Sequence, residues 1–238
     1  MRTVVFDLDG TLADTSADLL AAANACFSEL GHTPPLGPDD RLTAFHGGRA
    51  MLRLGFDRLG ITWSEADISR EYPRLLATYA DVLDRETQLY PGAVQAVHDL
   101  RALGFATAIC TNKPEGLAVE LVKRLGIAPL FGALVGADTF VVRKPDPLPY
   151  RAAVERAGGA VSRSFLIGDT QTDHDTARAA GVPIVLVSFA ARGWSRILQI
   201  RRIARLSPED VLAALRRRLR APAAAAATEH SPSFSFVT

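Results

Sequence analysis

Residues 4–11 read VVFDLDGT, an apolar run that ends in two carboxylates and a turn. Because successive side chains of a β-strand point to opposite faces, Asp7 and Asp9 lie on the same side, with Leu8 pointing away. Gly10 permits a sharp exit from the strand that a residue with a Cβ would resist. Two neighbouring carboxylates repel each other, so a fold that keeps both needs a cation or a shared proton. Taken alone, the stretch is also compatible with an ordinary strand followed by a polar turn.

Four further runs are short and almost continuously apolar: residues 105–110, 133–136, 165–168 and 184–187. Such runs are typical of strands in a parallel sheet that is covered on both faces. Helical patterns alternate with them at residues 93–103, 115–125, 148–157 and 173–180. The alternation predicts an α/β fold with a doubly wound parallel sheet. In such sheets ligands bind beyond the carboxyl ends of the strands, which is where Asp7 and Asp9 lie.

Residues 14–85 interrupt this alternation and have helical patterns throughout. Thr15 and Asp18 have the spacing of a capping box at the start of one helix, and Ser64 and Asp67 have it at the start of another. We therefore predict a small α-helical cap domain, inserted directly after the first strand.

The insertion divides the rest of the chain. We expect residues 1–13 and 86–220 to form an α/β catalytic core, and residues 14–85 to form the cap domain. Residues 221–238 are rich in alanine and then contain Ser, Thr and Pro, which favours disorder. The arginine-rich stretch 192–205 is interpreted as a solvated basic face, with an interface or a phosphate-rich partner as the alternative.

Composition limits the classes of function. The chain has 238 residues and a formal net charge of +1, which gives no indication of a nucleic-acid or membrane-surface partner. No apolar run approaches the ~20 residues that span a bilayer, and the N-terminus lacks a signal-peptide pattern. Cys26 and Cys110 are far apart in sequence, which favours two buried thiols in a reducing compartment. We expect a cytoplasmic protein, monomeric or homodimeric.

The second major strand, 105–110, ends in a polar pair. Thr111 and Asn112 supply a hydroxyl, an amide and backbone N–H groups at the start of a helix, which together can bind an anion. A helix cap made by either residue explains the same pattern. The lysine that follows, Lys113, is assigned no role beyond a surface or capping position, and the same holds for His174.

Two more strand ends carry charged residues. Lys144 precedes Pro145, which biases it to an extended conformation, although most lone lysines are solvated surface residues. The run 165–168 is followed by Asp169 and Asp173, which can face one point near a helix N-terminus. Ordinary capping by acids in a first turn is the alternative.

In order along the chain, D-x-D-G-T, T-N, K-P and G-D-x-x-x-D resemble the four motifs of the haloacid dehalogenase superfamily of phosphohydrolases, over residues 1 to about 190. The resemblance implies that Asp7 is the nucleophile that forms an aspartyl-phosphate. It implies that Asp9 protonates the leaving oxygen and later takes a proton from water. Thr111 and Asn112 would hold the phosphoryl oxygens, and Lys144 would neutralise charge on Asp7 and the phosphate.

The resemblance also implies a metal site. Asp7, the backbone carbonyl of Asp9, and Asp169 would bind Mg²⁺, with Asp173 as a further ligand or as a residue that supports the ligands. Simple electrostatics agrees, because each pair of like unit charges at ~4 Å costs about 4 kcal/mol at an effective dielectric of 20. One lysine cannot offset several carboxylates around a phosphate, whereas a hard divalent cation on oxygen ligands can.

Asp9 and the insertion indicate the subfamily. Dehalogenases release halide unprotonated and need no acid at that position, so Asp9 favours phosphoester chemistry. The helical insertion resembles the cap shared by phosphoglycolate phosphatases and β-phosphoglucomutases. Within it, residues 45–52 resemble the glycine-containing substrate loop of phosphoglycolate phosphatases, which implies substrate binding by Gly47, Gly48 and Arg49. A solvated Arg49 and a packed neighbouring histidine, His46, are the alternative.

We therefore expect a Mg²⁺-dependent phosphatase that acts on a small-molecule phosphomonoester, with 2-phosphoglycolate as the leading substrate. One alternative is a transferase similar to β-phosphoglucomutase, which would use the same Asp7 phosphoenzyme but return the phosphoryl group to a sugar. Another is a non-catalytic binding module with this fold. Phosphate release from a phosphoester without a bisphosphate activator separates the phosphatase from the transferase. Metal-dependent hydrolysis of para-nitrophenyl phosphate, abolished by a chelator, excludes the binding module.

Overall fold

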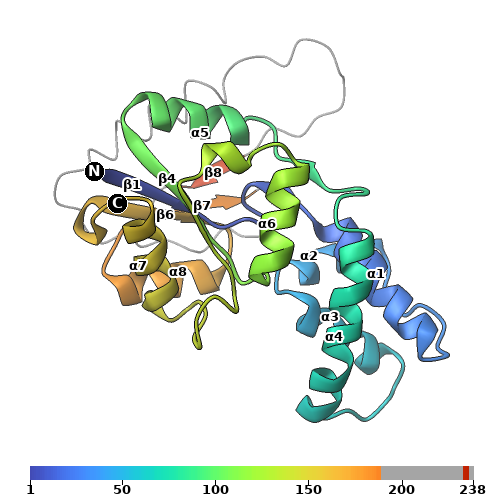
Figure 1. The fold of residues 1–238 in the computed structure, drawn as a ribbon. Helices are drawn as coiled ribbons and strands as arrows, with labels where there is room; N and C mark the ends of the chain where they lie inside the picture. The colour runs from blue at the N-terminus through green and yellow to red at the C-terminus, as the bar shows by residue number, and fades with distance from the viewer. Residues whose placement is uncertain (189–232, 236–238) are drawn as a thin grey trace, which may run out of the picture. The chain divides into compact units, whose positions relative to one another are not determined.

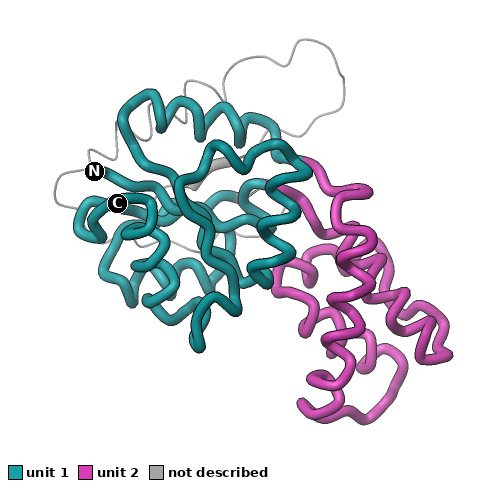
Figure 2. The backbone as a smooth tube through the Cα atoms, viewed as in Figure 1, with its two compact units in different colours: residues 1–12, 89–238 teal, residues 13–88 magenta. Residues whose placement is uncertain are grey.

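The computed structural model describes residues 1–188 and 233–235. The chain forms two compact units (Figure 2), of which unit 1 comprises residues 1–12 and 89–238 and unit 2 comprises residues 13–88. The arginine-rich stretch 192–205 and most of the segment 221–238 lie outside the described residues.

Unit 1 contains a six-stranded sheet in the order β5-β4-β1-β6-β7-β8 (Figure 1). Its strands are β1 (Arg2–Phe6), β4 (Phe105–Cys110), β5 (Ala133–Val135), β6 (Ser164–Gly168), β7 (Ile184–Ser188) and β8 (Ser233–Ser235). The pairs from β5 to β7 are parallel, and β8 pairs antiparallel with β7. β8 falls within 221–238, where the sequence favours disorder; at these three residues the backbone instead pairs with the edge of β7.

Helices cover both faces of this sheet. They are α5 (Ala93–Ala102), α6 (Glu115–Arg124), α7 (Pro147–Arg156) and α8 (Gln171–Ala180), with 3-10 turns at Ala128–Leu130 and Val161–Arg163. Figure 1 shows α5 on one side of the sheet and α7 and α8 on the other. The predicted doubly wound α/β fold is confirmed. Among the described helices, none combines the length and apolar character needed to cross a bilayer.

β1 lies between β4 and β6, and the register of these strands determines which residues meet at their carboxyl ends. Phe6 is level with Ile109 on one side and Ile167 on the other. The next residue along β1, Asp7, still donates its backbone N–H to the Ile167 carbonyl at 2.8 Å. The parallel ladder therefore continues to the acidic end of the strand and holds it in place.

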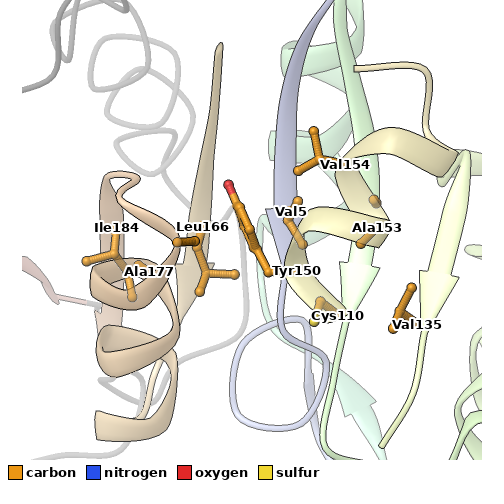
Figure 3. Packing of buried hydrophobic residues seen from close by; sticks show 11 residues of the cluster. Val5, Cys110, Val135, Tyr150, Ala153, Val154, Leu166, Ala177 and Ile184 are labelled. Carbon is orange, nitrogen blue, oxygen red and sulfur yellow. The ribbon is translucent and has the colours of Figure 1, made fainter. Parts of the chain in front are cut away.

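One cluster of buried apolar side chains in unit 1 lies between the sheet and helices α7 and α8 (Figure 3). Val5, Leu166 and Val135 contribute from three strands, and Tyr150 of α7 lies among them, fully buried. The Tyr150 hydroxyl is 2.7 Å from Ser164 Oγ, so its polar end is satisfied inside the core. This packing makes the carboxyl ends of the strands a rigid platform.

Unit 2 is mainly helical. It contains α1 (Ser16–Glu29), a 3-10 turn at Pro38–Asp40, α2 (Arg41–Ala44), α3 (Gly48–Arg58) and α4 (Glu65–Asp81). Two short strands, β2 (Ala13–Asp14) and β3 (Gln88–Leu89), pair where the chain enters and leaves the unit.

One of the two predicted capping boxes in unit 2 is confirmed and the other is wrong. At α4, the Asp67 N–H donates to Ser64 Oγ and the Ser64 N–H donates to Asp67 Oδ2. At α1, Thr15 makes no side-chain cap hydrogen bond. Instead, Asp14 Oδ1 accepts the N–H of Ser16 at 3.0 Å.

Asp18, the other half of the expected box at α1, has a different role. Its carboxylate accepts the backbone N–H groups of Glu86 and Thr87 and the hydroxyl of Thr87, at 2.7 to 3.1 Å. Because these donors lie 68 and 69 residues away, no local sequence pattern indicates them. Asp18 ties the first turn of α1 to the segment that leads out of unit 2.

Candidate active site

The charged residues at the strand ends of unit 1 meet around one buried lysine. Lys144 Nζ is 3.1 Å from Asp7 Oδ1 and 2.6 Å from Asp173 Oδ1. Lys144 is only 3% exposed, and a lysine is buried to that degree almost only when it is paired. The predicted contact between Lys144 and Asp7 is therefore present, and Asp173 joins it.

Asp173 is held by the start of α8 as well as by Lys144. Its Oδ2 accepts the Thr170 hydroxyl at 2.6 Å and the backbone N–H groups of Thr170 and Asp169 at 3.1 and 3.3 Å. The helix begins at Gln171 rather than at the predicted Asp173, because Thr170 caps it. With both oxygens accepting hydrogen bonds, Asp173 is suited to orient Lys144 and the loop before α8.

Asp169 faces the turn that follows β1. The Thr11 hydroxyl donates to Asp169 Oδ1 at 2.7 Å. Gly10 has φ +81°, and a Cβ built there would overlap the Asp169 carboxylate. Glycine is therefore required at this position both for its backbone conformation and for the space that Asp169 occupies.

Burial raises the pKa of two of these carboxyl groups. Asp7 has a pKa of about 7, because desolvation and the charges of Asp173 and Asp9 outweigh the opposing effect of Lys144. The pKa of Asp169 is raised well above its usual value, mainly by desolvation and then by the charges of Asp7 and Asp173. For Lys144, burial lowers the pKa, but Asp173 and Asp7 raise it more, so the lysine stays charged.

The acidic group fits a divalent cation. Asp7, Asp169 and Asp173 each offer a carboxylate oxygen, and these oxygens lie within 4.8 Å of one another. An all-oxygen donor set is the kind that Mg²⁺ prefers. Burial, and after it the charges of neighbouring carboxylates, raise the pKa of Asp7 and Asp169, and a bound cation would favour the charged form of both. Metal binding by these residues and by the Asp9 carbonyl stays a prediction.

Thr111 and Asn112 follow β4, directly beside the end of β1. The Thr111 N–H donates to the Val135 carbonyl at 2.9 Å, and its buried hydroxyl accepts the N–H of Lys113 at 3.1 Å. Asn112 donates its side-chain amide to the backbone carbonyl of Lys144 at 3.0 Å. The structure thus brings both residues to this edge of the sheet, and Asn112 supports the loop that carries Lys144.

Sequence reasoning missed Lys113. The expectation that it has only a surface or capping role is wrong, because the residue is 7% exposed and its Nζ lies 2.8 Å from Asp9 Oδ1. Asp9 is 104 positions away in sequence. The predicted strand order could have indicated this contact. A residue just after the second strand can reach the end of the first strand when the two strands are neighbours in the sheet.

The predicted substrate residues Gly47, Gly48 and Arg49 belong to unit 2. Gly47 has φ +87° at the N-cap of α3, and Gly48 is buried where a Cβ would press on the Leu75 side chain. The Arg49 guanidinium lies 4.4 Å from the ring centroid of Tyr72, and its Nη1 donates to Ser69 Oγ at 3.1 Å. Within unit 2 these residues form the start of α3; their role toward a substrate stays a prediction.

Residues 4–187 match the model of the family described as haloacid dehalogenase-like hydrolase. A phosphoglycolate phosphatase of Caulobacter vibrioides is 40% identical over 188 residues, which cover 79% of each chain. One from Mesorhizobium japonicum is 38% identical over 186 residues, covering 78% of this chain and 82% of the relative. A crystal structure from Haemophilus somnus, described as a predicted phosphoglycolate phosphatase, superposes with a TM-score of 0.67 at 22% identity, covering 77% of this chain and 84% of that one.

Proposed function

Since this chain belongs to the haloacid dehalogenase-like hydrolases and is a phosphoric monoester hydrolase, we propose that it hydrolyses 2-phosphoglycolate with Mg²⁺, through an aspartyl-phosphate on Asp7. The observation that carries the proposal is the buried Asp7 carboxylate, held 3.1 Å from Lys144 at the carboxyl end of the central strand. The names of the relatives support the choice of substrate.

In the first half-reaction, an Asp7 oxygen attacks phosphorus and the bond from phosphorus to the ester oxygen breaks. Asp9 gives its proton to the leaving oxygen. In the second half-reaction, Asp9 takes a proton from water as the water oxygen attacks phosphorus, and the bond from phosphorus to the Asp7 oxygen breaks. Inorganic phosphate leaves, and both carboxyl groups return to their starting states.

Acid–base help from Asp9 supplies about 10²- to 10⁴-fold, a small part of the acceleration of up to ~10²¹-fold that phosphate-monoester hydrolysis requires. Most of it must come from covalent catalysis and from charge placed around the phosphoryl group. Lys144 supplies one such charge, and Asp173 and Asn112 keep Lys144 in position. Thr111 would contribute its hydroxyl and nearby backbone N–H groups to the phosphoryl oxygens.

Asp7, the Asp9 carbonyl and Asp169 would hold Mg²⁺, and Asp173 would support this ligand set. When bound, the ion supplies positive charge that binds the phosphate and balances the carboxylates. The Thr11 hydroxyl orients Asp169, and the space left by Gly10 lets that carboxylate approach the turn after β1.

Unit 2 would act as the cap that selects the substrate. Arg49 can form a bidentate pair with the carboxylate of 2-phosphoglycolate, a geometry for which guanidinium groups are well suited. The contacts of Arg49 with Tyr72 and Ser69 hold its side chain at the start of α3.

The cytoplasm is the proposed site of action, as a monomer or homodimer. Cys26 and Cys110 are free and buried, as the sequence predicts. Burial raises the pKa of Cys26 to about 11 and that of Cys110 to about 12, so both thiols stay protonated and unreactive. Unreactive, unpaired thiols accord with a reducing compartment.

The test is phosphate release from a set of small phosphorylated acids, sugars and nucleotides, with Mg²⁺ and with a chelator. We expect 2-phosphoglycolate to be hydrolysed best, with no need for a bisphosphate activator, and the activity to disappear with the chelator. Efficient turnover of a different ester would overturn the substrate. Exchange of phosphoryl groups between sugar phosphates without phosphate release would instead indicate a transferase.

A further inference from the structure

Each of the two aspartates that follow the first strand contacts its own buried lysine. Lys144 contacts Asp7, and Lys113 contacts Asp9, with Lys113 Nζ 2.8 Å from Asp9 Oδ1. The side chain of Lys113 is 4% exposed, while that of Asp9 is 20% exposed. We propose that Lys113 is a positioning residue for Asp9, which fixes the carboxyl group in the orientation that proton transfer requires. This inference rests on the proposed phosphatase function.

The backbone of Lys113 is held on both sides. Its N–H donates to the Thr111 hydroxyl at 3.1 Å, and its carbonyl accepts the N–H of Ala137 at 2.9 Å. The first contact links Lys113 to the end of β4, and the second links it to the residues that follow β5. Because β4 is the direct neighbour of β1, a lysine fixed there reaches Asp9 without displacing either strand.

The contact with Lys113 also gives the two carboxylate oxygens of Asp9 different roles. An ammonium group has hydrogen-bond donors and no acceptor, so Oδ1 must stay unprotonated while it accepts from Lys113. Oδ2 is therefore the oxygen that we assign to proton transfer. A partly exposed carboxyl group that rotates freely would present Oδ2 to the reacting oxygen only part of the time. Fixing one oxygen removes this loss, and small errors of placement are costly in proton transfer.

The test uses leaving groups that differ in their need for a proton. An alkyl ester such as 2-phosphoglycolate releases a strongly basic alkoxide, whereas p-nitrophenyl phosphate releases a weakly basic phenolate. We expect Lys113→Met to lower kcat about 10- to 100-fold on the alkyl ester, as a part of the contribution of Asp9, and by only a few-fold on the aryl ester. Lys113→Arg, which keeps a donor, should recover part of the lost rate.

A double-mutant cycle separates action through Asp9 from direct action on the substrate. In an Asp9→Asn background, Lys113→Met should cause no further loss on the alkyl ester, because its effect has already been removed. The double variant also replaces both charges together, so it leaves no unpaired buried charge that could prevent folding. Lys123→Met, at an exposed position of α6, is the matched control and should behave as the wild type.

Three outcomes would overturn the proposal. The first is that Lys113→Met lowers kcat equally on both esters, while its inhibition by inorganic phosphate stays the same as in the wild type. The second is a loss that appears in KM and only for esters with a carboxylate, which would make Lys113 a substrate contact. The third is full additivity with Asp9→Asn. If the wild-type protein hydrolyses neither ester with Mg²⁺, the proposed function fails and this inference fails with it; an active wild type with any of the three outcomes refutes the role of Lys113 alone.

Discussion

The two units differ in how their buried carboxylates are compensated. In unit 2, Asp40 pairs with Arg58 at 2.5 Å, and Asp18 accepts hydrogen bonds from the backbone of the return segment. In unit 1, Asp7 and Asp173 share Lys144, and oxygens of both lie within 4.8 Å of an oxygen of Asp169. Buried charge in unit 2 is thus balanced locally and serves the fold. Buried charge in unit 1 is crowded, which costs stability and is suited to holding a cation and an anionic substrate.

The largest effect is expected at the centre of the crowded group. Asp7→Asn removes the nucleophile and should lower phosphate release by roughly 10⁵- to 10⁶-fold, the scale seen when covalent enzymes lose their attacking group. Asp18→Asn in unit 2 changes a buried carboxylate that has no chemical step, and should lower stability far more than kcat. Steady-state kinetics on folded variants measures both. Substantial turnover by Asp7→Asn would contradict the assignment of the nucleophile.

Replacing the buried lysine that two carboxylates share should lower the unfolding free energy more than replacing an exposed arginine. Lys144→Met leaves Asp7 and Asp173 without their buried partner, and the expected loss of unfolding free energy is about 3–5 kcal/mol. Arg53→Met breaks a surface pair with Glu65 and should cost no more than about 1 kcal/mol. Urea denaturation of the metal-free proteins gives both values. Similar losses for the two variants would remove the distinction between the units.

The pH dependence of stability should have opposite signs in the two units. The pKa of Asp7 rises from 3.8 to about 7 on folding. Between these pH values the folded protein therefore keeps a proton on Asp7 that the unfolded chain has already lost. The stability of the metal-free protein should therefore fall as pH rises from about 4 to about 7, by on the order of a few kcal/mol from this group. Asp7→Asn should reduce this slope and leave the part that the raised pKa of Asp169 contributes, and Mg²⁺ should restore stability near neutral pH.

The control for that slope is Asp67 of unit 2. Its pKa is lowered by hydrogen bonds from Ser64 and by Arg70, so its contribution is present above the unfolded pKa and is lost as pH falls. Asp67→Asn should leave the loss of stability between pH 4 and 7 intact. Thermal unfolding of the three proteins in chelator, over this range, measures the slopes; an unchanged slope in Asp7→Asn would show that the loss of stability does not originate at Asp7.

The smallest effect concerns the helix start that the sequence predicts correctly. Ser64→Ala removes the side-chain cap of α4 and should lower the unfolding free energy by about 1 kcal/mol. Ser69→Ala, at an exposed position of the same helix, removes only the surface hydrogen bond from Arg49 and should lower the unfolding free energy by less. Chemical denaturation resolves the difference, and equal effects would mean that the capping box contributes nothing.

The sequence predicts those features that depend on short-range patterns. Periodicity and strand-end motifs locate β1, β4 and β6 and the meeting of Asp7, Lys144 and Asp173, because parallel strands bring their carboxyl ends together. They do not predict that Lys113 reaches Asp9 or that Asp18 reaches Glu86, because these partners are 104 and 68 residues apart. A polar side chain near a helix start fits a local capping pattern whether it caps that helix or contacts a distant residue. Only the folded chain shows which of the two partners it has.

The paired strands β2 and β3 have a consequence for how this protein can be rebuilt. The chain leaves unit 1 at Leu12 and resumes it at Leu89, and the N–H of Tyr90 donates to the Leu12 carbonyl at 3.0 Å. The two cut ends of unit 1 are therefore already joined by a hydrogen bond, so that a turn of a few residues can replace 76 residues, 13 through 88. We therefore expect that an insertion of different length can be introduced at the same two points without altering the sheet that carries Asp7.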